Sequence, residues 1–72
     1  MNLSERFGGR VREARKALNF SQEELASISG VNRSHMGEIE RGQTSPTLIT
    51  IDRIATALNC SIAQLMDDNP SH

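Results

Sequence analysis

The polar side chains best placed to recognise another molecule are concentrated in residues 33–41. At helical spacing this segment has two different faces, because residues three and four positions apart lie side by side on a helix. One face is apolar and contains Met36 and Ile39. A compact polar face with a glycine at its centre suits a helix that enters the major groove of DNA, where its first residues reach base edges. The polar face comprises Arg33, Ser34, Gly37, Glu38 and Arg41.

Each polar residue near the start of this segment matches a hydrogen-bonding pattern on a base pair. Arg33 can donate two hydrogen bonds to guanine, Asn32 or Ser34 can serve adenine or several bases, and Glu38 can accept from cytosine. We therefore expect these four residues to contact bases. Phosphates repel a carboxylate, so Glu38 must either accept from a base or brace Arg33 or Arg41. Two alternatives stay open: Arg33 could be a solvated surface residue, and Asn32 could act mainly as a helix cap.

This segment is the second half of a predicted helix-turn-helix motif that spans about residues 22–41. Ser21 and Glu24 have the spacing of a capping box, which predicts that a helix begins directly after Ser21. Gly30 ends that helix, because glycine tolerates the left-handed conformation, and Asn32 can cap the next one. Two helices joined by so short a turn form a helix-turn-helix. Its expected apolar contacts are Leu25, Ala26, Ile28, Val31, Met36 and Ile39.

A longer amphipathic helix is predicted before the motif. Gly8 and Gly9 lie inside it, and close packing of a neighbouring element is one reason for glycine there. Apolar residues recur at every third or fourth position, which defines one buried face. That face comprises Leu3, Phe7, Val11, Ala14 and Leu18.

Two further helices are predicted after the motif, and they complete an all-α five-helix orthogonal bundle. Ser45 as N-cap, with Pro46 at the first helical position, opens the fourth helix. Ser61 and Gln64 form a second capping box, which opens a short fifth helix. Residues 67–72 are expected to form a frayed tail. The buried face of the fourth helix is expected to contain Leu48, Ile51, Ile54, Ala55 and Leu58.

Composition excludes several classes of function. The 72 residues allow one domain, over residues 1–72, with one small core and a net charge of −1. The charge is polarised, since residues 1–20 hold five basic and two acidic side chains, while residues 21–72 hold three basic and seven acidic ones. One cysteine and two histidines far from it predict neither a disulfide nor a metal site. No clustered nucleophile and base, cofactor motif, ligand site or membrane span is evident, so we expect a cytoplasmic protein that is not an enzyme.

Several motifs occur together at fixed spacing. They are Ser21-Gln22-Glu23-Glu24-Leu25-Ala26, Gly30-Val31, Ile39-Glu40-Arg41-Gly42, Pro46 and the stretch from Ile51 to Leu65. With these motifs the sequence resembles the phage repressor and Cro-type helix-turn-helix family over roughly residues 7–66. The resemblance implies a lambda-repressor-like DNA-binding domain, similar to the small dimeric controller proteins of restriction–modification systems.

The resemblance also implies roles for single residues. Gln22 would anchor a phosphate and brace the second motif helix, while Gln43 and Thr44 would form a phosphate-contacting loop. Arg15 and Glu40 would form an ion pair that ties the first helix to the second motif helix. Helix N-termini also attract phosphates. The full set of expected phosphate contacts is Ser21, Gln22, His35, Arg41, Gln43 and Thr44.

An apolar patch outside the predicted core suggests self-association. Ile49 lies off the buried face of its helix, and with Ile62 and Met66 it predicts a self-complementary surface. A chain this short is marginally stable alone, so we expect a homodimer with its second motif helices about 34 Å apart on a pseudo-palindromic operator. The predicted function is a sequence-specific transcriptional regulator, such as a repressor, that binds double-stranded DNA. An antitoxin-like protein-interaction module that also binds its own promoter is the alternative.

Overall fold

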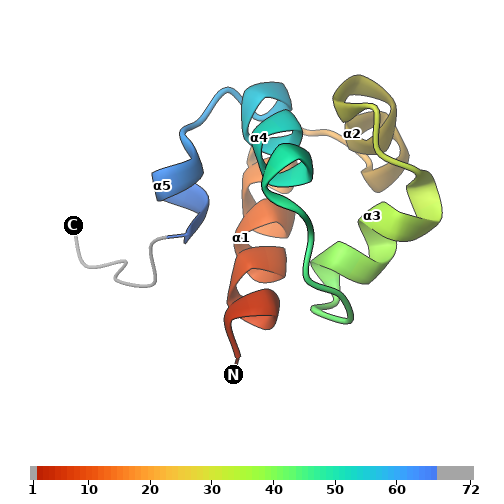
Figure 1. Ribbon diagram of the computed structural model, residues 1–72. Coiled ribbons are helices and arrows are strands. Elements are labelled where there is room, and N and C mark those ends of the chain that lie inside the picture. The colour runs from red at the N-terminus through yellow and green to blue at the C-terminus, as the bar shows by residue number, and fades with distance from the viewer. Residues whose placement is uncertain (1, 67–72) are drawn as a thin grey trace.

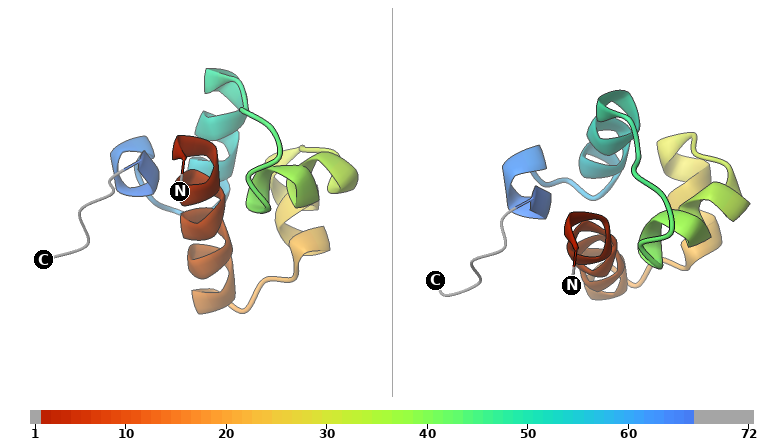
Figure 2. Two further views of the ribbon diagram at one scale, coloured as in Figure 1. Left: turned by 90° about the horizontal axis from the view of Figure 1, so that it is seen from below. Right: turned by 60° about the horizontal axis from the view of Figure 1, so that its bottom comes forward.

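The computed structural model describes residues 2–66, and in that range it contains five helices and no strand. In Figure 1, α2 and α3 lie on one side of α1 and α5 lies on the other. Figure 2 shows that α4 lies between these two groups, and it contacts both α2 and α5. The all-α prediction is confirmed, whereas the predicted tail at 67–72 lies outside the described residues. The helices are α1 (Leu3–Ala17), α2 (Gln22–Ser29), α3 (Arg33–Glu40), α4 (Leu48–Ala57) and α5 (Ile62–Met66).

One hydrophobic core joins the five helices, and α1 contacts α2, α3 and α5 directly. The largest side chains that are fully buried come from four different helices, so each of these helices buries its apolar face against the others. The core comprises Phe7, Val11, Leu25, Ala26, Met36, Ile39, Ile54, Ala55, Leu58 and Leu65.

Four apolar residues that were expected to be buried are exposed. Leu3 and Leu48 are the first residues of α1 and α4, and Leu18 is the C-cap of α1. Periodicity identifies the correct face of a helix, but it does not show where neighbouring elements stop covering that face. Ile28 is also exposed, and Ser29 is buried beside it, with its hydroxyl donating to the Leu25 carbonyl at 2.7 Å.

Local capping residues fix most helix starts as predicted. Ser21 and Glu24 form a complete capping box at α2, and Ser61 and Gln64 exchange the same two hydrogen bonds at α5. Each box satisfies two backbone N–H groups that lack partners inside the helix. A third box was not predicted. It joins Asn2 to Glu5 and begins α1.

The predicted start of α4 is wrong by two residues. Ser45 does not cap the helix, because its hydroxyl is hydrogen-bonded to the hydroxyl of Ser4 at 3.0 Å. Thr47 is the N-cap instead, and its side chain accepts a hydrogen bond from the Thr50 backbone N–H at 3.2 Å. Pro46 therefore lies before the helix, in the connection from α3, and not at the first helical position.

Close packing explains the glycine at position 8 but not the one at position 9. A Cβ atom on Gly8 would collide with the carbonyl oxygen of Ile39 and would lie 2.7 Å from that of Glu40. A Cβ atom on Gly9 would meet nothing within 4 Å. The backbones of α1 and α3 therefore touch at Gly8, and this contact fixes the position of α3 on the body of the protein.

Candidate nucleic-acid interface

The turn between α2 and α3 sets the direction of α3. Gly30 adopts the left-handed conformation, with φ of 72°, and the Val31 N–H donates to the Ala26 carbonyl at 3.0 Å. Asn32 then caps α3, because its side-chain oxygen accepts from the backbone N–H groups of Ser34 and His35. The helix-turn-helix prediction is thus confirmed in detail. We call α3 the recognition helix from here on.

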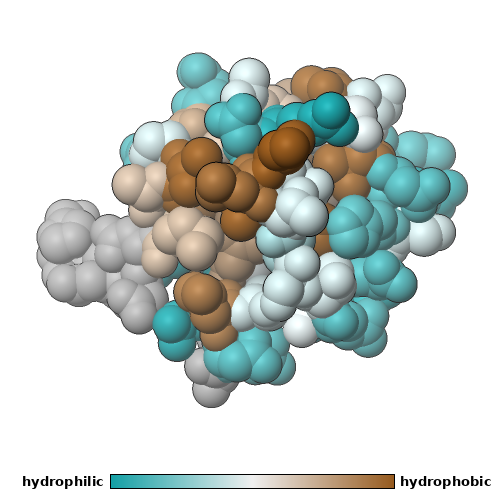
Figure 3. Space-filling model, in the orientation of Figure 1, coloured by the Kyte–Doolittle hydropathy of each residue, from teal (hydrophilic) through white to brown (hydrophobic). Residues whose placement is uncertain are grey.

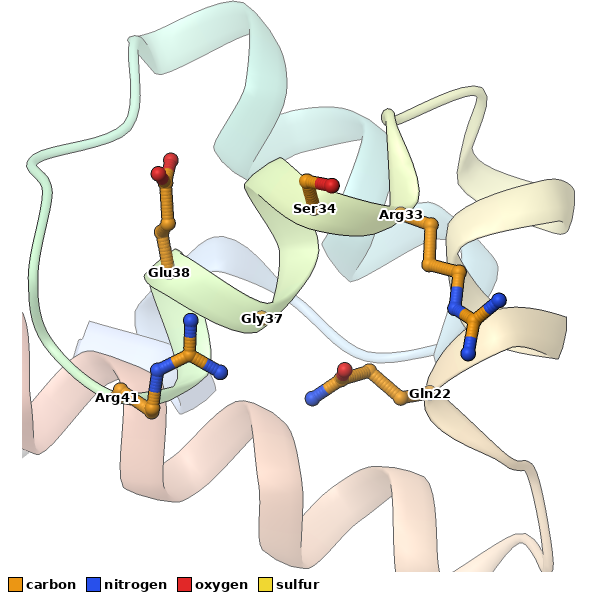
Figure 4. A pocket seen from close by; sticks show the side chains of 6 residues that line it. All are labelled: Gln22, Arg33, Ser34, Gly37, Glu38 and Arg41. Atoms are coloured by element: carbon orange, nitrogen blue, oxygen red, sulfur yellow. The ribbon is translucent and has the colours of Figure 1, made fainter.

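The recognition helix has one buried side and one exposed side. Met36 and Ile39 are 0% exposed, so the apolar side is locked into the core. On the opposite side Arg33, Ser34 and Glu38 are exposed. With three neighbours they line a shallow depression of about 350 Å³, shown in Figure 4, which we call the reading face. Its lining residues are Gln22, Arg33, Ser34, Gly37, Glu38 and Arg41.

Asn32 was expected to contact bases but does not line the depression. Its side-chain oxygen is used by the cap of α3, which leaves the amide NH₂ group as its remaining hydrogen-bonding group. The two roles considered for Asn32, helix cap and base contact, therefore involve different atoms of its side chain. The oxygen caps the helix, and the NH₂ group could donate to a base.

Arg33 has an ion-pair partner that the sequence did not indicate. Its Nη1 lies 3.3 Å from Oε2 of Glu23, on α2, and both side chains are about 70% exposed. An exposed pair of this kind contributes about 0–1 kcal/mol. The Arg33 guanidinium is therefore oriented by Glu23 and remains free to exchange this partner for a base.

Glu38 does not brace either arginine of the reading face. Its Oε1 lies 3.4 Å from Nδ1 of His35, one turn earlier on the same helix. Arg33 is held by Glu23 instead, and Nε of Arg41 donates to the side-chain oxygen of Gln43 at 3.1 Å. The bracing role considered for Glu38 is wrong, and base contact stays a prediction.

A buried ion pair joins α1 to the end of the recognition helix. Arg15 donates from Nε to Oε2 of Glu40 at 2.8 Å and from Nη2 to Oε1 at 3.0 Å. Gln22 adds a third hydrogen bond to this carboxylate at 3.2 Å, and Arg15 also donates to the Phe20 carbonyl. The Glu40 side chain is 3% exposed. These contacts connect α1, the start of α2 and α3 at one point.

Gly37 lies at the centre of the reading face, beneath two side chains. A Cβ atom on Gly37 would lie 3.0 Å from Nη1 of Arg41 and 3.3 Å from Oε1 of Gln22. Figure 4 shows these two side chains pointing toward one another across the glycine. The missing side chain therefore makes room for Gln22 and Arg41.

The residues expected to contact phosphates come from three segments, and two of them, Gln22 and Arg41, also line the reading face. Ser21 and Gln22 begin α2, His35 and Arg41 belong to the recognition helix and its C-cap, and the loop after it carries the last two. Gly42 starts that loop with φ of 74°, and a Cβ atom there would meet Glu5 of α1. The loop is thereby held against α1. Its two expected phosphate ligands are Gln43, which is exposed, and Thr44, which is half-buried.

An apolar surface lies away from the reading face. Ile49 and Leu48 are 68% and 71% exposed at the start of α4, while Ile62 and Met66 of α5 are half-buried against the core. Figure 3 shows hydrophobic side chains gathered over α4 and α5, whereas hydrophilic ones cover the side of α3. We call Leu48, Ile49, Ile62 and Met66 the α4–α5 patch. Three of these residues, Ile49, Ile62 and Met66, are the ones expected at a dimer interface, which stays a prediction.

The rest of the described chain offers little other chemistry. Burial raises the pKa of the Cys60 thiol, which packs against the core. Within residues 2–66 no group of three His, Cys, Asp or Glu side chains is placed to hold a metal ion. No helix in this range is both long and apolar enough to cross a membrane.

Residues 11–65 match the helix-turn-helix family HTH_3. The control protein C.SmaI of Serratia marcescens is 41% identical over 66 residues, which are 92% of this chain and 79% of that protein. SinR of Bacillus subtilis, an HTH-type transcriptional regulator, is 34% identical over 62 residues, which are 85% of this chain and 56% of SinR.

Solved structures give the same result. The restriction-modification controller protein C.AhdI of Aeromonas hydrophila superposes with a TM-score of 0.84 at 45% identity, covering 86% of this chain and 94% of that one. SinR in complex with DNA superposes with a TM-score of 0.81 at 34% identity, covering 85% of this chain and 98% of that one.

Proposed function

Since this chain belongs to the HTH_3 helix-turn-helix family and is a transcriptional regulator with a helix-turn-helix DNA-binding domain, we propose that it binds a pseudo-palindromic operator as a homodimer. One observation carries the proposal: the recognition helix buries Met36 and Ile39 completely and exposes Arg33, Ser34 and Glu38. Such a helix fits a major groove about 12 Å wide and offers its first residues to the bases.

The hydrogen-bonding groups of the reading face define the expected contacts. Arg33 exchanges its weak contact with Glu23 for two hydrogen bonds to guanine O6 and N7. Ser34 can donate or accept at several bases, and Asn32 donates from its NH₂ group. Glu38 accepts from the cytosine N4 amino group. Because each arginine–guanine pair discriminates by about 1–3 kcal/mol, Arg33 contributes most to sequence preference.

Phosphate contacts hold the recognition helix in register. Gln22 uses one N–H group on Glu40 and keeps the second for a phosphate oxygen. Arg41 and Gln43 are already joined by a hydrogen bond beside the groove-facing helix, and Thr44 follows them in the loop. Ser21 and His35 complete the set. These contacts position the protein on any sequence and carry no base preference themselves.

The α4–α5 patch supports the homodimer. Ile49 projects from α4 with about two thirds of its surface exposed, and Leu48 beside it is equally open. Covering this apolar surface with a second copy stabilises the dimer by about 25 cal/mol for each Å² of apolar area removed from water. A two-fold axis through this patch relates two recognition helices, and a spacing of about 34 Å places them in successive major grooves on one side of the duplex.

Selection of bound fragments from random duplex DNA tests this function directly. We expect the enriched sequences to share a pseudo-palindrome whose half-sites are separated by about one helical turn. Sedimentation of the selected duplex with the protein should give two chains per site. Enrichment of a single half-site bound by one chain contradicts the homodimer, and no enrichment over random sequence contradicts specific recognition.

A further inference from the structure

A second depression adjoins the reading face, between α1 and the recognition helix. It has a volume of about 490 Å³ and is lined by Arg12, Arg15, Gln22, Glu40 and Arg41. Gln22 and Arg41 also line the reading face, so the two depressions share a rim. Figure 4 shows both side chains lying above α1. The second depression therefore continues the reading face past Arg41 toward α1.

The second depression is positively charged. Its lining includes three guanidinium groups and one carboxylate. The carboxylate of Glu40 is almost completely buried and is neutralised by its two hydrogen bonds from Arg15. Arg12 has no ion-pair or hydrogen-bond partner among residues 2–66, and Arg41 uses only its Nε, on Gln43. Two positive charges therefore remain for an anion.

We propose that this depression is a phosphate subsite for duplex DNA, in which Arg12 of α1 and Arg41, the C-cap of the recognition helix, hold one backbone phosphate between them. This inference rests on the proposed function, and it adds α1 to an interface otherwise built from α2, α3 and the following loop. The buried Arg15–Glu40 pair lies between these two arginines. Because Arg15 is bound to Glu40, it is not available to the phosphate, and the pair holds α1 against the recognition helix.

Loss of one phosphate contact has a defined signature in salt dependence. Each phosphate contact contributes about 0.9 to the slope of log K against log salt. Because Arg41 still reaches the shared phosphate, Arg12→Gln should lower that slope by up to about 0.9 for every duplex. If the whole contact is lost and acts through counterion release alone, affinity falls about 8-fold at about 0.1 M salt and about 4-fold at about 0.2 M. Base preference stays unchanged, because a phosphate contact carries no sequence information.

Arg10→Gln is the matched control. It removes the same charge from the same helix, but residue 10 lies two positions away, on the opposite side of α1 from residue 12. Fluorescence anisotropy of labelled short duplexes, with the full chain at several salt concentrations, gives both slopes. Circular dichroism shows whether each variant keeps its helices. Inorganic phosphate added at constant ionic strength distinguishes a duplex phosphate from a free one, and we expect it not to displace DNA.

The outcomes separate this inference from the proposed function. A larger slope change for Arg12→Gln than for Arg10→Gln supports the subsite. Equal changes for the two variants, or displacement of DNA by inorganic phosphate, overturn it while specific DNA binding stands. A protein that binds no duplex at all overturns both.

Discussion

Replacing Arg15 with methionine tests how the buried ion pair holds the recognition helix. The substitution keeps an apolar chain of similar length but leaves the Glu40 carboxylate without its cation. That carboxylate is 3% exposed and would keep only the single hydrogen bond from Gln22. Removing one partner of a buried pair costs about 3–5 kcal/mol. Because the Arg15 side chain is 12% exposed, some water can reach the site, and we expect the lower part of this range.

A loss of about 3 kcal/mol is large for this chain. A domain of 72 residues has a free energy of unfolding of about 4–11 kcal/mol. For domains of this size each 1 kcal/mol lowers Tm by about 4–8 °C, so Arg15→Met should lower it by at least about 12 °C. The chain has no Trp or Tyr, and urea unfolding is therefore best followed by circular dichroism of the helices.

The double variant Arg15→Met/Glu40→Leu separates the charge from the packing. It removes the stranded carboxylate, and apolar replacement of a buried pair is often close to neutral. We expect it to be more stable than Arg15→Met alone, although it changes one more residue. The reasoning is refuted if Arg15→Met costs less than about 1 kcal/mol. It is also refuted if the losses of Arg15→Met and Glu40→Leu, each measured alone, simply add in the double variant.

Three further predictions concern packing, assembly and thiol reactivity. Gly8→Ala should destabilise the chain by about 1–3 kcal/mol, because its Cβ meets the backbone of α3. Gly9→Ala should stabilise it by up to about 1 kcal/mol, because its Cβ meets nothing. Equal shifts of the two urea midpoints would contradict this. Ile49→Asp should convert the homodimer to monomer in sedimentation experiments, and Ile28→Asp, at another exposed isoleucine, should not; dissociation by both variants would place the interface elsewhere. Because burial raises its pKa, Cys60 should react slowly with iodoacetamide at mildly alkaline pH and faster in urea, and equal rates would show an open thiol.

Local signals in the sequence were sufficient for most of the fold. The Ser21–Glu24 and Ser61–Gln64 boxes act within a single helical turn, so their spacing alone predicts them. The same spacing in Asn2 and Glu5 could have predicted the start of α1. Core positions in the middle of helices were also predictable, because there the inward face of each helix is covered by neighbouring helices.

Contacts between distant residues account for what the sequence did not predict. Ser45 has the residue type of an N-cap, but its hydroxyl bonds to Ser4, which lies 41 positions earlier. Similarly, Arg33 bonds to Glu23, which lies ten residues away in the other motif helix. Glu38 is the exception, because its partner His35 lies one turn away on the same helix. In each case a side chain had several suitable partners in the sequence. Only the folded arrangement decides which of them lies within hydrogen-bond distance.

The central claim is that the exposed side of the recognition helix reads base pairs. Its most direct test is the affinity of wild-type protein and Arg33→Ala for a set of duplexes that each carry one base-pair change in the selected site, with Gln22→Ala as the comparison. We expect Arg33→Ala to lose about 1–3 kcal/mol and to abolish discrimination at one base pair of each half-site, while Gln22→Ala weakens every duplex alike. Unchanged discrimination at every position in Arg33→Ala would contradict the assignment of this face.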